Sequence, residues 1–205
     1  MNDRTDPRLT DLIRVYDEAL DPDLCARIIE LMEADPEQQF QRATQRTWVE
    51  YLITRNPNPQ WREIERALIE NMVRHLAEYA TLPTAGMLAR KSARAFEHLK
   101  VKKYQADVGE PHHFPLHVDV FDHRSAMRTV AFLWYLNTVD EGGDTVFPVL
   151  DTRVAPRAGR LVIMPPYWMY EHVGEAPISG DKYILTSYVN WRDPDDDFRF
   201  SYPIR

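Results

Sequence analysis

Apolar residues at three- and four-residue spacing predict two amphipathic helices in the first half of the chain, over residues 22–34 and 60–79. The apolar positions are Leu24, Ile28, Leu31 and Met32 in the first helix, and Trp61, Ile64, Leu68, Met72 and Leu76 in the second. Asp21 followed by a proline is a favourable start for the first helix. Between the helices, the aromatic and β-branched residues 48–53 predict a strand, and residues 82–92 are expected to form a loop.

From about residue 98 the pattern changes to short apolar runs separated by turn residues such as Gly142-Gly143. The expected strands are residues 98–105, 115–120, 128–137, 144–148, 160–164, 170–173 and 181–191. Strands at this spacing predict an α+β fold: a sandwich or jelly roll with the N-terminal helices packed on one outer face. Residues 1–97 would form the helical segment with one or more strands, residues 98–205 the β core, and both together a single domain.

Composition narrows the range of partners. The net charge of −7 argues against a nucleic-acid partner, which would require a basic surface. A basic group before residue 104 (Lys91, Arg94, Lys100, Lys102 and Lys103) is interpreted as a solvated strand edge. No apolar run is long enough to span a bilayer, and no secretory signal is recognised. With Cys25 as the only cysteine, a cytoplasmic location is expected; nothing in the pattern specifies an oligomeric state.

The candidate chemistry centres on His117-Val118-Asp119 and the later His172. If residues 116–120 form a strand, His117 and Asp119 point to the same side. Two imidazoles and one carboxylate form the facial triad that binds non-haem Fe(II) and leaves coordination positions open. An H-x-D tripeptide alone is weak evidence, because a chain with seven histidines and many acidic residues can contain one by chance.

Further motifs follow in order: Tyr135-Leu136-Asn137, then a G-G-D-T-V-F segment ending at Phe147, and Lys182 shortly after His172. Together these residues resemble the Fe(II)- and 2-oxoglutarate-dependent oxygenases of the prolyl 4-hydroxylase type, over roughly residues 98–191. The resemblance implies a double-stranded β-helix (jelly roll). It also implies a dioxygenase that uses Fe(II), 2-oxoglutarate and O2, with ascorbate as a candidate reductant, and hydroxylates an unactivated C–H bond.

The same resemblance implies roles for individual residues. His117, Asp119 and His172 would ligate iron, and Lys182 would pair with the distal carboxylate of 2-oxoglutarate. The hydroxyl of Tyr135 would complete this pocket, and Tyr104 would line it. Strand alternation adds Thr186, which shares a face with Lys182.

Each of these residues also has an ordinary interpretation. A single histidine is more often a core or surface residue than a ligand, and Tyr135 could be plain core packing. Arg128 and Trp191 could line a substrate entrance or be buried against the barrel. His113 could face the pocket or the solvent.

The substrate is expected to be a prolyl or other residue of a peptide, or a free amino acid. Two alternatives stay open. The chain could be a catalytically silent ligand-binding or sensor protein. Nucleic-acid demethylation is less favoured, because no arginine follows His172 before Arg192.

Overall fold

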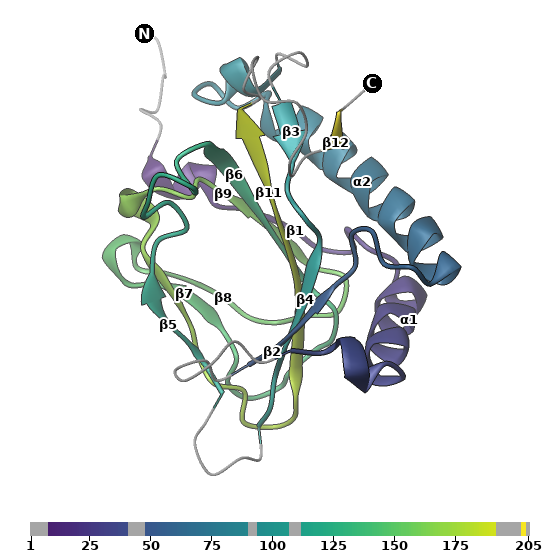
Figure 1. Cartoon of the computed structure of the whole chain (residues 1–205). Coiled ribbons are helices and arrows are strands. Elements are labelled where there is room, and N and C mark those ends of the chain that lie inside the picture. The colour runs from purple at the N-terminus through teal and green to yellow at the C-terminus, as the bar shows by residue number, and fades with distance from the viewer. Residues whose placement is uncertain (1–7, 41–47, 90–93, 107–111, 192–201, 204–205) are drawn as a thin grey trace, which may run out of the picture.

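Two antiparallel β-sheets face each other in the computed structural model (Figure 1), which describes residues 8–40, 48–89, 94–106, 112–191 and 202–203. The larger sheet contains β1 (Arg14–Tyr16), β9 (Leu161–Met164), β6 (Arg128–Tyr135), β11 (Lys182–Trp191), β3 (Arg94–Phe96) and β12 (Tyr202–Pro203) in that order. β4 (Lys100–Tyr104) also pairs with β11, and β2 (Val49–Leu52) pairs with β4. The smaller sheet has the order β5 (Phe114–His117), β10 (His172–Gly174), β7 (Thr145–Phe147) and β8 (Thr152–Val154). The expected α+β class and jelly-roll arrangement are thereby confirmed.

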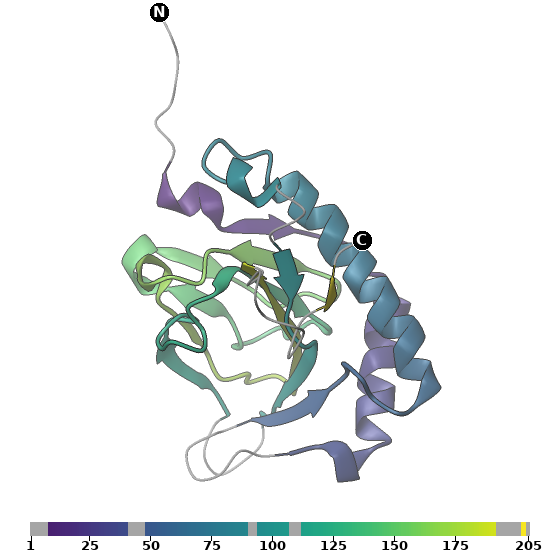
Figure 2. The ribbon, with the colours of Figure 1, turned by 45° about the horizontal axis from the view of Figure 1, so that its top comes forward.

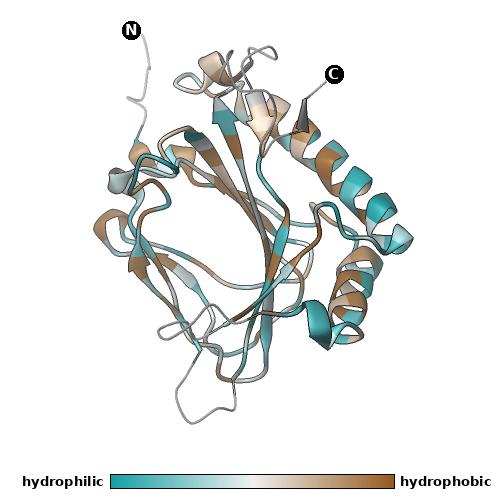
Figure 3. Ribbon diagram, in the orientation of Figure 1, coloured by the Kyte–Doolittle hydropathy of each residue, from teal (hydrophilic) through white to brown (hydrophobic). Residues whose placement is uncertain are grey.

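The two helices are α1 (Pro22–Glu33) and α2 (Pro59–Tyr79), close to the predicted ranges. Both begin at a capping side chain followed by proline: Asp21 accepts a hydrogen bond from the backbone N–H of Asp23, and Asn58 accepts one from Gln60. In Figure 3 both helices combine hydrophobic and hydrophilic residues, as amphipathic helices do. No helix in the described ranges is both long and apolar enough to span a membrane.

Both helices lie along the outside of the larger sheet (Figure 2). Ile28 of α1 and Leu68 of α2 are fully buried and belong to the same hydrophobic cluster as Trp134 and Leu185 of the sheet. One polar residue joins the layers within this apolar contact. Asn71 of α2 accepts a hydrogen bond from Trp134 Nε1 and donates one to the carbonyl of Ala19.

Replacing Asn71 by alanine should destabilise the fold, because Trp134 N–H would lose its buried acceptor and the Ala19 carbonyl would keep only the 3.4 Å hydrogen bond from Arg74. The expected loss is about 1–3 kcal/mol of unfolding free energy, the cost of one unsatisfied buried group. Urea denaturation measures this loss. The matched control is Glu70→Ala, an exposed neighbour on the same helix. Equal stabilities of the two variants would show that the Asn71 contacts contribute nothing.

Several element boundaries differ from the sequence prediction. The strand expected at residues 115–120 ends at His117, so Asp119 is not part of it. A 3-10 helix occupies Gly86–Ala89 within the expected loop, and another, Trp168–Tyr170, precedes β10. The three-residue strands β1, β3 and β8 were not predicted, whereas β7 and β10, which are equally short, overlap predicted strands.

Candidate active site

A cavity between the two sheets collects the candidate functional residues. Its lining includes His117, Asp119 and His172 on one side, and Lys182, Ile184, Thr186 and Tyr188 along β11. The β11 residues alternate in sequence, as expected when one face of a strand lines a cavity. The His117 side chain is 22% exposed and Lys182 only 2%, so the histidine lies at the open side and the lysine at the closed side.

His117, Asp119 and His172 converge on a common point. One potential ligand atom from each lies within 4.8 Å of the others. The two histidines are directly opposite in the pairing of β5 with β10, and their ring centroids are 4.2 Å apart. Neighbouring strands lie about 5 Å apart, which is the spacing that brings two imidazoles to one ion.

Backbone contacts fix the tautomer of both imidazoles. His117 Nδ1 lies 2.9 Å from the carbonyl oxygen of Pro115, and His172 Nδ1 lies 3.0 Å from that of Tyr170. A carbonyl only accepts, so each Nδ1 carries the hydrogen and each Nε2 keeps its lone pair. Burial lowers the pKa of His172 to about 4, against the opposing charge of Asp119, so this imidazole is neutral near pH 7.

The loop after β5 places Asp119 through contacts to the larger sheet, which corrects the expectation that strand alternation does so. Tyr188 of β11 donates a 2.7 Å hydrogen bond to Asp119 Oδ1, and Arg128 of β6 donates a 2.9 Å bond to the Asp119 carbonyl. Burial alone would raise the pKa of Asp119. The contacts with His117, His172 and Tyr188 outweigh burial and lower it, so the carboxylate is ionised.

Two imidazoles and an ionised carboxylate, open toward a cavity, fit the ligand preference of a divalent transition metal such as non-haem Fe(II). Asp119 Oδ1 accepts the hydrogen bond from Tyr188 and lies 3.6 Å from His117 Nε2. The larger sheet therefore orients Asp119, whereas the two histidines belong to the smaller sheet.

Lys182, at the start of β11, is held at the closed side of the cavity. Its Nζ donates hydrogen bonds to the carbonyls of Gly143 (2.8 Å) and Glu175 (3.1 Å) and lies 4.7 Å from the centroid of the Tyr104 ring. Burial lowers its pKa to about 8, although the charges of Asp144 and Glu175 raise it.

Gly143 is suited to this contact in two ways. Its φ is +76°, and a Cβ there would lie 3.2 Å from the Lys182 side chain. Gly143 therefore does more than turn the chain.

The other cofactor-binding candidates divide into two groups. Tyr104 and Thr186 line the cavity with Lys182. Tyr135 is fully buried but is not among the lining residues; its hydroxyl donates to Thr145 Oγ1 at 2.6 Å, and Thr145 lines the cavity. Tyr135 thus contacts the cavity through Thr145.

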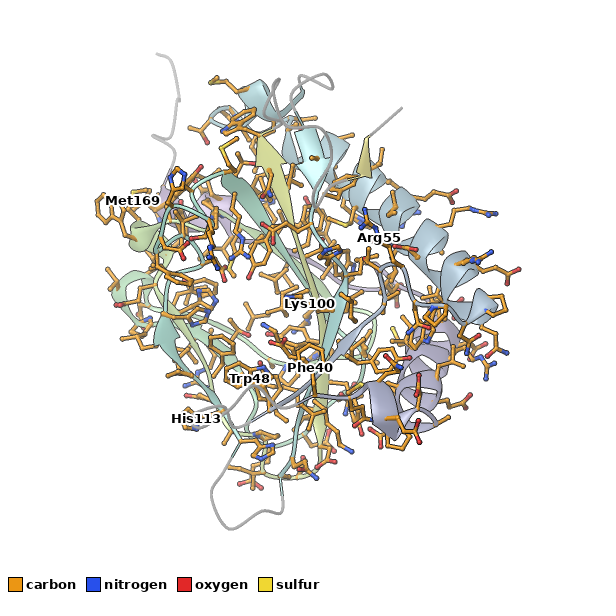
Figure 4. All side chains as sticks on the ribbon, in the orientation of Figure 1. Phe40, Trp48, Arg55, Lys100, His113 and Met169 are labelled. Carbon is orange, nitrogen blue, oxygen red and sulfur yellow. The ribbon has the colours of Figure 1, made fainter. Side chains whose placement is uncertain are left out.

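The three candidate substrate residues lie outside the cavity lining. Arg128 forms a bidentate ion pair with Glu97, with distances of 2.7 and 2.9 Å, and its guanidinium lies 3.8 Å from the centroid of the Tyr188 ring. Trp191 is partly buried against the cluster beneath the helices. His113 is exposed (Figure 4), because β5 begins only at Phe114 and strand alternation does not extend to it.

Sequence reasoning missed Lys102, which also lines the cavity. β4 lies between β2 and β11, so it is not the solvated edge that its lysines suggested. Lys102 and Tyr104 are two residues apart and therefore share a face of the strand. That alternation was the available signal, and it was outweighed by the high charge of the segment.

The comparisons with known proteins agree with this geometry. Residues 99–190 match the model of the 2OG-Fe(II) oxygenase superfamily, and no curated protein matches the chain in sequence. Three similar solved structures are prolyl hydroxylases. One is the viral collagen prolyl hydroxylase of Paramecium Bursaria Chlorella virus-1 in its 2OG complex, with 18% identity and a TM-score of 0.64; the match covers 89% of this chain and 97% of the viral one.

The second is a prolyl-4-hydroxylase from Pseudomonas putida, with 18% identity, a TM-score of 0.66 and coverage of 89% of this chain and 94% of that chain. The third is a prolyl hydroxylase from Trichoplax adhaerens in complex with a peptide fragment of the hypoxia inducible factor oxygen degradation domain. It shows 16% identity, a TM-score of 0.67 and coverage of 88% and 84%. Residues 99–190 are therefore similar to the 2OG-Fe(II) oxygenase superfamily, and the chain has the fold of these prolyl hydroxylases.

Proposed function

We propose that this protein hydroxylates an unactivated C–H bond of a prolyl or other amino-acid residue in a peptide, or of a free amino acid. The observation that carries the proposal is the convergence of His117, Asp119 and His172 within 4.8 Å, at the open side of a cavity whose closed side holds Lys182. In this assignment the three converging residues ligate the iron, and Lys182 anchors the distal carboxylate of 2-oxoglutarate.

When bound, iron and 2-oxoglutarate supply the oxidising chemistry, with succinate and carbon dioxide as co-products. The protein supplies position and charge. The two Nδ1–H groups anchored on backbone carbonyls keep both Nε2 atoms directed at the metal. Tyr188 keeps one oxygen of Asp119 occupied, and Arg128 fixes the backbone of the same residue. A retained carboxylate ligand favours hydroxylation over halogenation, because in halogenating relatives a halide takes the place of the carboxylate.

The co-substrate end of the cavity combines a cation with hydroxyl groups. Lys182 offers a point charge and lacks the bidentate fork of arginine, so hydroxyl donors should complete the recognition of a carboxylate. Thr145 and Tyr104 line this end, and Tyr135 would act by holding Thr145 Oγ1. The carboxylate-binding hydroxyl that the sequence motif assigns to Tyr135 would thus come from Thr145, with Tyr135 positioning it.

A peptide substrate is supported by the solved neighbours, which include prolyl hydroxylases and one peptide complex. A silent ligand-binding protein is disfavoured, because the complete donor set, the lysine and an open cavity occur together. Nucleic-acid demethylation is disfavoured by the net charge of −7.

The test of this function is a 2-oxoglutarate-dependent assay under air with Fe(II). The protein is expected to convert 2-oxoglutarate to succinate, and a screen of peptides and free amino acids should yield a product heavier by one oxygen atom. Absence of both co-substrate turnover and 2-oxoglutarate binding would contradict the assignment.

Replacing Arg128 by methionine should weaken metal binding without removing a ligand, because it releases the Asp119 backbone and leaves Glu97 without its cation. Loss of a group that orients a metal ligand typically costs about 10- to 100-fold in metal affinity. Anaerobic calorimetry with Fe(II) measures the change. Arg124→Met is the matched control, because Arg124 is exposed in the loop between Asp119 and β6. Equal affinities in the two variants would assign Arg128 a purely structural role.

A further inference from the structure

Lys102 of β4 is a second cation in the cavity, and the roles proposed above do not use it. Lys102 pairs with Ile184 of β11, while Lys182 pairs with Tyr104. Two residues along a strand span roughly 7 Å, so Lys102 lies about that far along the sheet from the level of Lys182. The β11 residues beyond Ile184 lead to Tyr188, which contacts Asp119. Lys102 therefore lies between the carboxylate anchor and the metal ligands.

The ammonium group of Lys102 reaches across the cavity to the smaller sheet. Its Nζ lies 4.8 Å from the centroid of the Phe114 ring and 6.0 Å from that of Trp48. These two rings stack at 4.4 Å, and Phe114 in turn packs against His117 at 4.1 Å. In Figure 4 Trp48 lies between β5 and β4. The aromatic pair thus holds the cation beside the metal-binding histidine.

The contacts of the two lysines differ. Lys182 Nζ donates to two carbonyl oxygens, whereas no acceptor among the described residues lies within hydrogen-bond distance of Lys102 Nζ. An ammonium group has three N–H donors, and the π-face of an aromatic ring replaces an acceptor only in part. Burial lowers the pKa of Lys102 to about 8, while the charges of Glu50 and Asp119 raise it. An anionic acceptor would satisfy both the donors and the charge.

We propose that Lys102 is a second carboxylate-binding group of this cavity, distinct from Lys182 and located on the metal side. Two sources of the carboxylate fit this position: the 1-carboxylate of 2-oxoglutarate, and a carboxylate of the substrate to be hydroxylated. The inference rests on the proposed function, since it takes the cavity to be the co-substrate and substrate site.

The first arm of the test compares two 2-oxo acids on the Zn(II)-loaded protein by calorimetry. 2-Oxoglutarate carries both carboxylates, and 2-oxopentanoate lacks the distal one. If Lys102 binds the 1-carboxylate, Lys102→Met weakens both ligands by about 10- to 100-fold, as expected for a charged hydrogen bond. Lys182→Met weakens only 2-oxoglutarate. The two lysines are therefore distinguished by which ligand is affected.

The second arm keeps 2-oxoglutarate bound and compares acids with their amides: L-proline with L-prolinamide, and N-acetylaspartate with N-acetylasparagine. If Lys102 binds a substrate carboxylate, at least one acid binds about tenfold or more tightly than its amide, as a charged hydrogen bond predicts. Lys102→Met abolishes that preference.

Two further variants serve both arms. Lys102→Arg keeps the charge and should retain most of the binding. Lys103→Met is the matched control, because the adjacent Lys103 contacts Glu33 and Asp181 and not the cavity.

A change in either arm that is specific to Lys102→Met supports the proposal and identifies the source of the carboxylate. The proposal is overturned if Lys102→Met binds all ligands of both arms as tightly as the wild type. It is also overturned if Lys103→Met shows the same losses, or if Lys102→Met has lost the thermal transition and Lys102→Arg is as defective in binding. Failure of the wild type to bind 2-oxoglutarate at all would instead contradict the proposed function.

Discussion

Replacing Asp119 by alanine is expected to reduce 2-oxoglutarate turnover to background while leaving the protein folded. The substitution removes the one anionic ligand of the proposed iron site, and the two imidazoles that stay cannot by themselves complete the facial set. Succinate production in the presence of Fe(II) measures the loss, and circular dichroism with a thermal melt checks the fold. His172→Ala should give the same result.

The control for this experiment is Asp140→Ala, which removes an exposed aspartate. It should retain full turnover. Turnover at the wild-type rate in Asp119→Ala, or in His172→Ala, would show that iron is bound elsewhere and would remove the basis of the site assignment.

Replacing Lys182 by methionine should raise the KM for 2-oxoglutarate by roughly a hundredfold or more, since breaking a buried ion pair costs about 3–5 kcal/mol. The distal carboxylate would face an apolar group, and the carbonyls of Gly143 and Glu175 would lose their donor. Steady-state kinetics with varied 2-oxoglutarate measures the change. An unaltered KM would mean that another group anchors the co-substrate.

The pH dependence of the KM for 2-oxoglutarate gives a second test of the role of Lys182. The pKa of Lys182 is lowered to about 8 by burial, so the ammonium form predominates below pH 8 and is lost as pH rises through this value. Only the ammonium form pairs with a carboxylate, and the KM for 2-oxoglutarate should therefore increase above pH 8. In Lys182→Arg, where the guanidinium keeps its charge, the increase should be smaller.

Local periodicity predicted much of this fold. The two helices follow from apolar spacing and proline-containing starts, and the long strands β6 and β11 follow from their β-branched and aromatic runs. Alternation along β11 placed Lys182 and Thr186 on one face, and both line the cavity. The strands β1, β3 and β8 were not predicted, because three residues are too few to show periodicity; the equally short β7 and β10 were predicted from the turn residues around them.

Site details that depend on contacts between distant segments were beyond sequence reasoning. The position of Asp119 depends on Arg128 and Tyr188, which belong to other strands. Lys102 lies on an interior strand because β2 pairs with the edge of β4 that faces away from β11. The hydroxyl of Tyr135 donates to Thr145, and it is Thr145 that lines the cavity.

The three proposed ligands do not belong to a single sheet. The two histidines are neighbours on β5 and β10, whereas the carboxylate is tied by Tyr188 and Arg128 to β11 and β6. A metal ion bound there would cross-link the two sheets of the jelly roll. Part of its binding free energy would therefore appear as resistance to the sheets separating, so that loading the metal and closing the barrel become a single event.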